Sequence, residues 1–130
     1  MWVFTKEGFF SAVQHRNDPT KVVVRTRFAD DLYKVFPGLS NQIKYTPEAD
    51  YPYRITLPKS TWALYLDTRA YDIDYTNFKA SLTDDARHDC YLKIWRVLRD
   101  EQLRIERENR KPAPKTKKYP IVKRKPKTKK

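Results

Sequence analysis

Residues 21–28 show the clearest alternation of hydrophobic and polar positions in the chain. One side of an extended strand there would carry Val22, Val24, Thr26 and Phe28, and the other side would carry Val23, Arg25 and Arg27. Successive side chains of a strand point to opposite faces of a sheet. The pattern therefore predicts a half-buried strand in an antiparallel sheet.

Four further segments have the short apolar or alternating pattern of strands, namely residues 2–5, 9–16, 42–46 and 53–57. Residues 6–8 form a predicted turn, in which Gly8 is expected to supply a positive φ. Residues 17–20 form another, because Asx residues and proline favour turns. The first three strands are therefore expected to be joined by short turns.

Three segments have the three- and four-residue spacing of amphipathic helices, at about 29–36, 59–73 and 83–109. The residues expected on their buried sides are Leu32, Val35 and Phe36, then Trp62, Leu66, Ala70 and Ile73, and finally Tyr91, Ile94, Trp95, Leu98 and Ile105. Thr83 is the expected N-cap of the last helix. This order of elements predicts a single α+β domain over residues 1–110. It would have an antiparallel sheet with helices on one face, as a ferredoxin-like variant, and a long C-terminal helix.

The charge of the chain is concentrated at its C-terminal end. The formal net charge is +12, of which residues 111–130 contribute +10 and residues 1–110 only +2. The basic residues of the end segment are Lys111, Lys115, Lys117, Lys118, Lys123, Arg124, Lys125, Lys127, Lys129 and Lys130. Four prolines and the mutual repulsion of like charges predict a disordered tail. Such a tail can displace counterions from the phosphates of DNA or RNA without reading sequence.

Composition narrows the class of protein further. One cysteine, Cys90, excludes an intramolecular disulfide, and two glycines argue against glycine-rich phosphate loops. No apolar run approaches the roughly 18 residues of a membrane span, and residues 1–7 lack the pattern of a signal peptide. We therefore expect a cytoplasmic protein with no membrane partner and no cofactor.

Candidate chemistry in residues 1–110 is sparse. Asp67, Asp72 and Asp74 lie off the spacing that would align them for a metal, and solvated carboxylates are the expected reading. His88, Asp89 and Cys90 are consecutive, so a helix points them about 100° apart and they cannot converge on one atom. We expect a surface His88 and a small core Cys90, with no catalytic residue and no metal ligand.

Two body segments are candidates for ligand contacts. In residues 74–79, Tyr75, Asn77 and Lys79 could bind a ligand, although the preferred interpretation is an interhelical anchor in which Asn77 takes a left-handed or capping conformation. Arg25 and Arg27 share one strand face. Aromatic rings such as Phe9 or Tyr53 could join them in a platform for stacking and charge.

Four segments together resemble a family of small proteins of bacteria and their viruses to which no activity is assigned. They are residues 1–11 (MWVFTKEGFFS), 51–54 (YPYR), 73–79 (IDYTNFK) and 91–98 (YLKIWRVL). The resemblance covers roughly residues 1–100, and the basic tail departs from the usual pattern. It implies a single-domain fold and a bacterial cell or a phage-infected host, and it implies no function.

The sequence predicts a non-enzymatic adaptor. Its body would recognise a protein partner or a second copy, and its tail would attach it to DNA, RNA or a nucleoprotein machine such as a polymerase or ribosome. One alternative is a protein-only regulator, for example a small viral factor that binds or inhibits a host complex. A second is a small enzyme with its site around Asp74, Asn77 and Lys79. The oligomeric state and the choice between DNA and RNA stay open.

Overall fold

The structure, a computed structural model, describes residues 1–110. Within it the chain forms two compact units, one of residues 1–83 and one that begins at Asp84. Each unit is described by itself. The predicted disordered tail, residues 111–130, lies outside the described residues.

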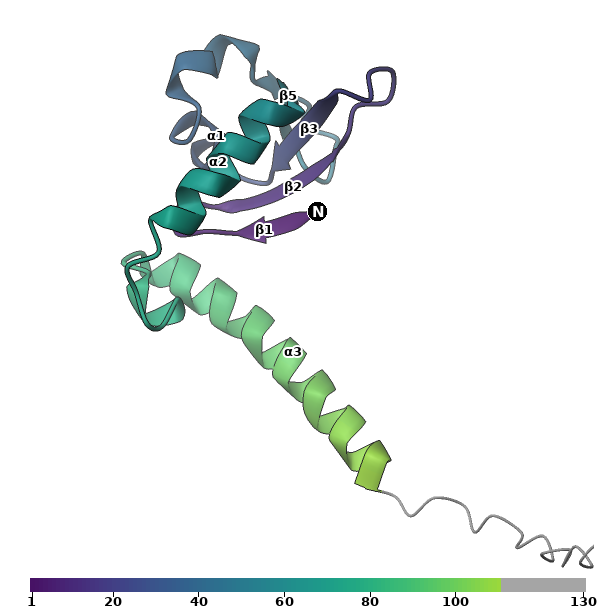
Figure 1. Ribbon diagram of the computed structural model, residues 1–130, viewed down its shortest axis with the longest axis vertical. Helices are drawn as coiled ribbons and strands as arrows, with labels where there is room; N and C mark the ends of the chain where they lie inside the picture. The colour runs from purple at the N-terminus through teal and green to yellow at the C-terminus, as the bar shows by residue number, and fades with distance from the viewer. Residues whose placement is uncertain (111–130) are drawn as a thin grey trace, which may run out of the picture. The chain divides into compact units, whose positions relative to one another are not determined.

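The first unit is built on a five-stranded antiparallel sheet (Figure 1). Its strands are β1 (Trp2–Phe4), β2 (Phe9–Gln14), β3 (Lys21–Thr26), β4 (Lys44–Tyr45) and β5 (Tyr53–Pro58), in the spatial order β1-β2-β3-β5-β4. The predicted turns join the first three strands. The backbone N–H of Thr5 donates to the Gly8 carbonyl at 2.9 Å, and that of Thr20 donates to Asp18 Oδ1 at 2.9 Å.

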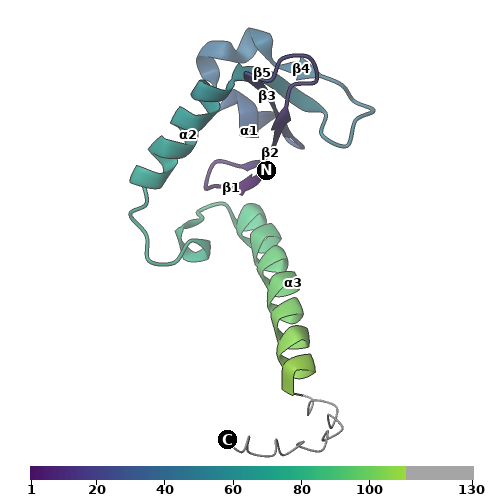
Figure 2. The same ribbon diagram turned by 45° about the vertical axis from the view of Figure 1, so that its right-hand side comes forward.

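Two helices, α1 (Ala29–Tyr33) and α2 (Lys59–Tyr71), pack on one face of this sheet (Figure 2). The buried core between the sheet and these helices consists of Phe10, Ala12, Val22, Val24, Leu32, Phe36, Ile55, Leu57 and Trp62. Two 3-10 turns, η1 (Pro37–Gln42) and η2 (Lys79–Ser81), complete the unit. The predicted α+β class and the placement of helices on one face are confirmed. Because hairpins rather than helices join the first three strands, the strand order differs from the β-α-β-β-α-β pattern of ferredoxin-like folds.

Several local expectations are wrong. Phe28 is 68% exposed, because β3 ends at Thr26 and Phe28 takes the N-cap position of α1. Gly8 has no positive φ, so its turn needs glycine for a different reason. Ala70 on α2 is exposed, because the face packed toward the sheet continues from Trp62 through the half-buried Tyr65. Ile73 is also exposed, because α2 ends at Tyr71 and Ile73 lies beyond it.

The second unit contains one long helix, α3 (Asp85–Arg110). Asp84, rather than Thr83, caps it, since Asp84 Oδ1 accepts the backbone N–H of Arg87 at 2.7 Å. The expected buried side is wrong from Trp95 onward, where Trp95 is 47%, Leu98 67% and Ile105 44% exposed. Cys90 is exposed and is not a core residue. No helix in the described part of the chain is long and apolar enough to cross a membrane.

Candidate functional site

One row of side chains runs across all five strands on the face opposite the helices. Strand register places these residues side by side, in the order Trp2, Ser11, Arg25, Arg54 and Lys44. The core residues occupy the alternate positions of the same strands, so the row points away from α1 and α2. We call this surface the basic face. It comprises the five residues of the row together with Lys21 and Arg27.

The charge of the basic face follows from the strand sequences. The five strands contain Lys21, Arg25, Lys44 and Arg54 and no Asp or Glu. All four cations fall at positions that alternate with the core. The predicted split of β3 into an apolar and a basic side is therefore confirmed and extends to β4 and β5.

Three of these cations lie directly opposite one another. Arg25 pairs with Arg54 across β3 and β5, and Arg54 pairs with Lys44 across β5 and β4. Like charges at directly opposite positions destabilise a sheet. Within residues 1–110 the structure gives none of the three a carboxylate partner, although Lys21, at the far end of β3, is 3.8 Å from Asp18. The centre of the basic face is thus an uncompensated positive patch.

Tyr51 lies between two of the arginines. Its ring centroid is 4.8 Å from the guanidinium carbon of Arg25 and 4.5 Å from that of Arg27. Arg27 also donates to the carbonyl of Asp50 at 2.8 Å, and Asp50 Oδ1 accepts the backbone N–H of Tyr51 at 2.9 Å. These contacts hold the loop before β5 over the sheet. They fix the guanidinium planes without neutralising their charge.

Hydrogen bonds orient the remaining arginine contacts. Arg25 Nη2 donates to Ser11 Oγ at 2.8 Å, and Arg54 Nε donates to the carbonyl of Tyr51 at 3.1 Å. Both arginines are half-buried, whereas Arg27 and Lys44 are exposed. A guanidinium that spends one donor on a neutral oxygen has further donors for an anion, although Arg25 Nε is buried and not among those that can reach one. The geometry is therefore suited to carboxylate or phosphate groups arriving from outside.

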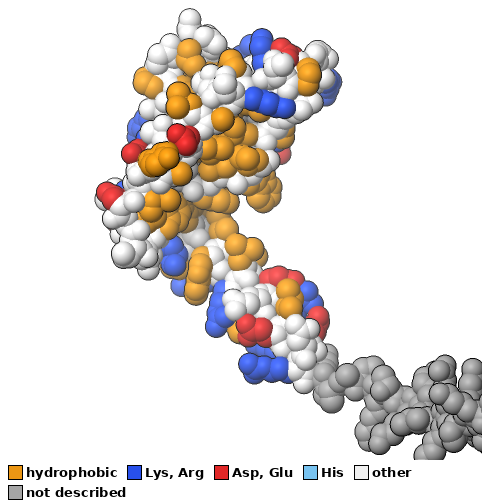
Figure 3. Space-filling view, in the orientation of Figure 1, with side chains coloured by type: hydrophobic (Ala, Val, Ile, Leu, Met, Phe, Trp, Pro, Cys, Tyr) orange, Lys and Arg blue, Asp and Glu red, His pale blue; other side chains and the backbone are white. Residues whose placement is uncertain are grey.

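Aromatic rings continue this surface toward the edge strand. The Phe9 ring lies 6.2 Å from Tyr51 and stacks on Phe4 at 4.5 Å. Trp2 meets Phe9 edge to face at 5.8 Å and is 69% exposed. Figure 3 shows hydrophobic side chains gathered over β1 and the adjoining part of the sheet. Cations and aromatic rings thus occupy one continuous face.

Part of this surface was predictable from the sequence. Arg25, Arg27 and Phe9 do come together as a platform. Tyr53 does not join them, because it pairs with Thr26 on the core side and stacks on Tyr45 at 5.0 Å. Four members of the surface were not predicted, namely Trp2, Tyr51, Arg54 and Lys44. For Arg54 the sequence did hold a signal, because its alternation with the apolar Ile55 places it on the opposite face of the strand.

The other predicted ligand segment, residues 74–79, has separate surroundings. The ring of Tyr75 lies 5.7 Å from Phe78 and has Lys6 Nζ 5.2 Å from its centroid. Asn77 Oδ1 accepts the backbone N–H of Ala80 at 3.1 Å and so caps η2. Lys79 is half-buried. Asn77 takes the capping role of the preferred interpretation. The interhelical anchoring role of Tyr75 and a ligand role for Tyr75, Asn77 and Lys79 stay predictions.

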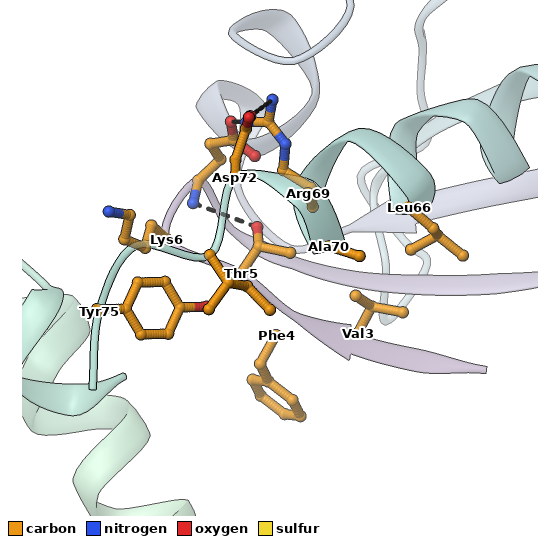
Figure 4. A pocket seen from close by; sticks show the side chains of 11 residues that line it. Val3, Phe4, Thr5, Lys6, Leu66, Arg69, Ala70, Asp72 and Tyr75 are labelled. Carbon is orange, nitrogen blue, oxygen red and sulfur yellow. Dashed lines mark hydrogen bonds and ion pairs between the residues drawn. The ribbon is translucent and has the colours of Figure 1, made fainter. Parts of the chain in front are cut away.

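A cavity of about 240 Å³ lies between the end of β1, the turn after it and the last turn of α2 (Figure 4). Its charged groups bind one another, since Arg69 pairs with Glu7 and is 2.8 Å from Asp72. Tyr65 Oη donates to Glu7 Oε2 at 2.6 Å. Burial, together with this bond to a carboxylate, raises the pKa of the Tyr65 hydroxyl. The network braces α2 against the β1–β2 turn and leaves little polar capacity for a ligand.

The remaining candidate residues do not assemble into a centre. Asp72 pairs with Arg69, and Asp74 lies 3.8 Å from Lys6. His15 Nδ1 accepts backbone N–H groups of the turn at Asn17 and Asp18. Residues 1–110 contain no group of three His, Cys, Asp or Glu side chains that could hold a metal ion.

Comparison with known proteins adds nothing to these observations. No family model, no curated protein and no solved structure matches the chain. The basic face and the charge of the sequence are therefore the observations that bear on function.

Proposed function

We propose that this protein is a non-enzymatic, nucleic-acid-associated adaptor. The observation that carries the proposal is the adjacency of Arg25, Arg54 and Lys44 across three strands without a carboxylate partner among the described residues. Three cations at directly opposite positions lower the stability of the sheet when no anionic ligand is bound. Phosphate groups of a polynucleotide supply the missing negative charge.

The sequence of residues 111–130 supports the same partner. Ten basic residues and no acidic residue in twenty positions provide a second, sequence-independent source of phosphate affinity. The body would then fix where on the nucleic acid, or on which nucleoprotein assembly, the protein is held. Affinity should come from both parts and should fall steeply as the salt concentration rises.

The test measures binding of the full-length protein to DNA and RNA oligonucleotides over a salt series. In one variant, all ten Lys and Arg residues of 111–130 are replaced by Gln. In another, Arg27→Gln and Lys44→Gln remove two exposed charges of the basic face. Lys34→Gln with Lys93→Gln is the matched control, because it removes two exposed charges elsewhere.

We expect the tail variant to lose most of the low-salt affinity and most of the salt slope. The face variant should lower the slope of log K against log[salt] by about 1–2, while the control should change it much less. Equal affinity of the tail variant, the face variant and the wild-type protein at low salt would refute the proposal.

A protein-only regulator is a second candidate function. It is favoured by the apolar side chains that α3 exposes, namely Val97, Leu98 and Ile105, because exposed apolar patches mark partner surfaces. A host protein that co-purifies stably after nuclease treatment, and is lost from a Leu98→Ser variant, would favour this function over the adaptor.

A further inference from the structure

We infer that the basic face binds single-stranded nucleic acid and that Trp2 stacks on an unpaired base. This inference rests on the proposed function and narrows it from nucleic acid in general to one form of it. The position of the Trp2 indole relative to the cations carries this inference.

Trp2 ends the row that contains the three opposed cations. Neighbouring strands of a sheet lie about 4.8 Å apart, so Arg25 is about 10 Å from Trp2 along the row and Lys44 about 19 Å. A polynucleotide lying along the row would place phosphates near the cations and a base near the indole. The phosphates and a base of the polynucleotide would therefore both be bound by the same surface.

The indole is free to stack. It is 69% exposed, and the only ring contact that it makes within residues 1–110 is the edge-to-face contact with Phe9. An edge-to-face contact engages at most one face of the indole, so at least one face has no aromatic neighbour. Stacking on an aromatic side chain is how proteins bind unpaired bases without reading their sequence.

A duplex offers a base face to this side chain only at the cost of unstacking a base step. Its bases are stacked on one another and present only their edges in the grooves, so a side chain at the protein surface does not reach a base face. A duplex would gain the cations of the basic face but not the indole. An acidic protein surface would likewise match the cations, and polyglutamate is the competitor that tests for such a partner.

The experiment measures binding of the full-length protein to a labelled 12-nucleotide single strand, as DNA and as RNA, and to a 12-base-pair duplex. It is repeated in the background with the ten basic residues of 111–130 replaced by Gln, which removes the sequence-independent contribution of that segment. The variants are Trp2→Ala and Trp2→Phe. The matched control is Tyr71→Ala, which removes another highly exposed aromatic ring, from α2.

We expect Trp2→Ala to weaken single-strand binding by about 5- to 100-fold, with duplex binding unchanged. Trp2→Phe should restore part of the loss, and Tyr71→Ala should have no effect. Circular dichroism should show the same fold for all variants. A loss for DNA alone or RNA alone also supports the inference and tells which polynucleotide is bound.

Three results would overturn the inference. Trp2→Ala could leave single-strand binding unchanged, or weaken duplex binding equally. Polyglutamate could displace the single strand as efficiently as unlabelled oligonucleotide does. In the first two cases the proposed function survives, because the charge variants still weaken binding and lower its salt dependence. If the wild-type protein binds no oligonucleotide at low salt, the proposed function fails with it.

Discussion

The Cα of Gly8 lies against the buried side chain of Asp31, which is 2% exposed. A Cβ added at Gly8 would stand 2.5 Å from Asp31 Cγ and 2.7 Å from its Cβ. Asp31 Oδ2 accepts the backbone N–H of Phe9 at 3.2 Å. The contact therefore ties the start of β2 to α1, and it requires glycine for space.

Gly8→Ala should destabilise the protein by about 1–3 kcal/mol, because neither the buried carboxylate nor the turn can move away freely. Chemical denaturation measures the change in the free energy of unfolding. Gly38→Ala is the control, because nothing lies within 4 Å of its added Cβ, and it should change stability by less than about 0.5 kcal/mol. Equal effects at the two glycines would contradict the proposed close contact.

Lys44→Gln should raise the stability of the free protein by about 0.2–1 kcal/mol, because it removes one of three opposed positive charges. Added salt should stabilise the wild-type protein more than this variant, since salt screens the repulsion. Thermal unfolding at low and high salt measures both effects. Lys34→Gln provides the comparison. That lysine is 3.3 Å from Asp30, so its loss should bring no gain. A lower melting temperature for Lys44→Gln would show that repulsion among the three opposed cations does not destabilise the sheet.

Asp84→Ala should weaken the first turn of α3 by about 1 kcal/mol, because Asp84 Oδ1 accepts the backbone N–H of Arg87. Amide hydrogen exchange at Arg87 and His88 should become faster. Thr83→Ala should change these rates little, although the sequence made Thr83 the expected cap. A reversed order of the two effects would restore Thr83 to that role.

The alternation of the strands could be read from the sequence, because it depends only on neighbours in the chain. Val22 and Val24 are buried and Arg25 is not, as the period of two requires. The opposition of Lys44 and Arg54 could not be read in this way. It depends on which residues of two separate strands pair, and a shift of one residue would move every side chain to the other face.

The predictions that were wrong have a related cause. An amphipathic spacing shows that Leu98 and Ile105 share a side of α3, but it does not show whether anything covers that side. A glycine in a short turn suggests a positive φ, but the space that Gly8 needs is set by Asp31, 23 positions later in the chain. Tyr51 has no pattern of its own in the sequence that indicates a site. Its place between Arg25 and Arg27 follows from the long-range packing of its loop.

Tyr65→Phe should reduce stability at pH 8 and have less effect at pH 11. The hydroxyl of Tyr65 donates to Glu7 and lies 3.1 Å from Thr5 Oγ1, and losing these bonds costs about 1–2 kcal/mol. Burial and the neighbouring carboxylate raise the pKa of Tyr65 in the folded protein above the value of about 10 in an unfolded chain. Above pH 10 the unfolded state therefore loses the proton first, and the wild-type protein loses stability as the pH rises.

The Phe variant has no hydroxyl to ionise, so its stability should fall less over the same range. Urea denaturation of both proteins at pH 8, 9.5 and 11 gives the two curves, which should converge toward high pH. Tyr71→Phe serves as the control, because that ring is highly exposed and α2 does not rely on it for packing. A constant difference between wild type and Tyr65→Phe at all three pH values would show that the bond to Glu7 does not hold the proton on Tyr65.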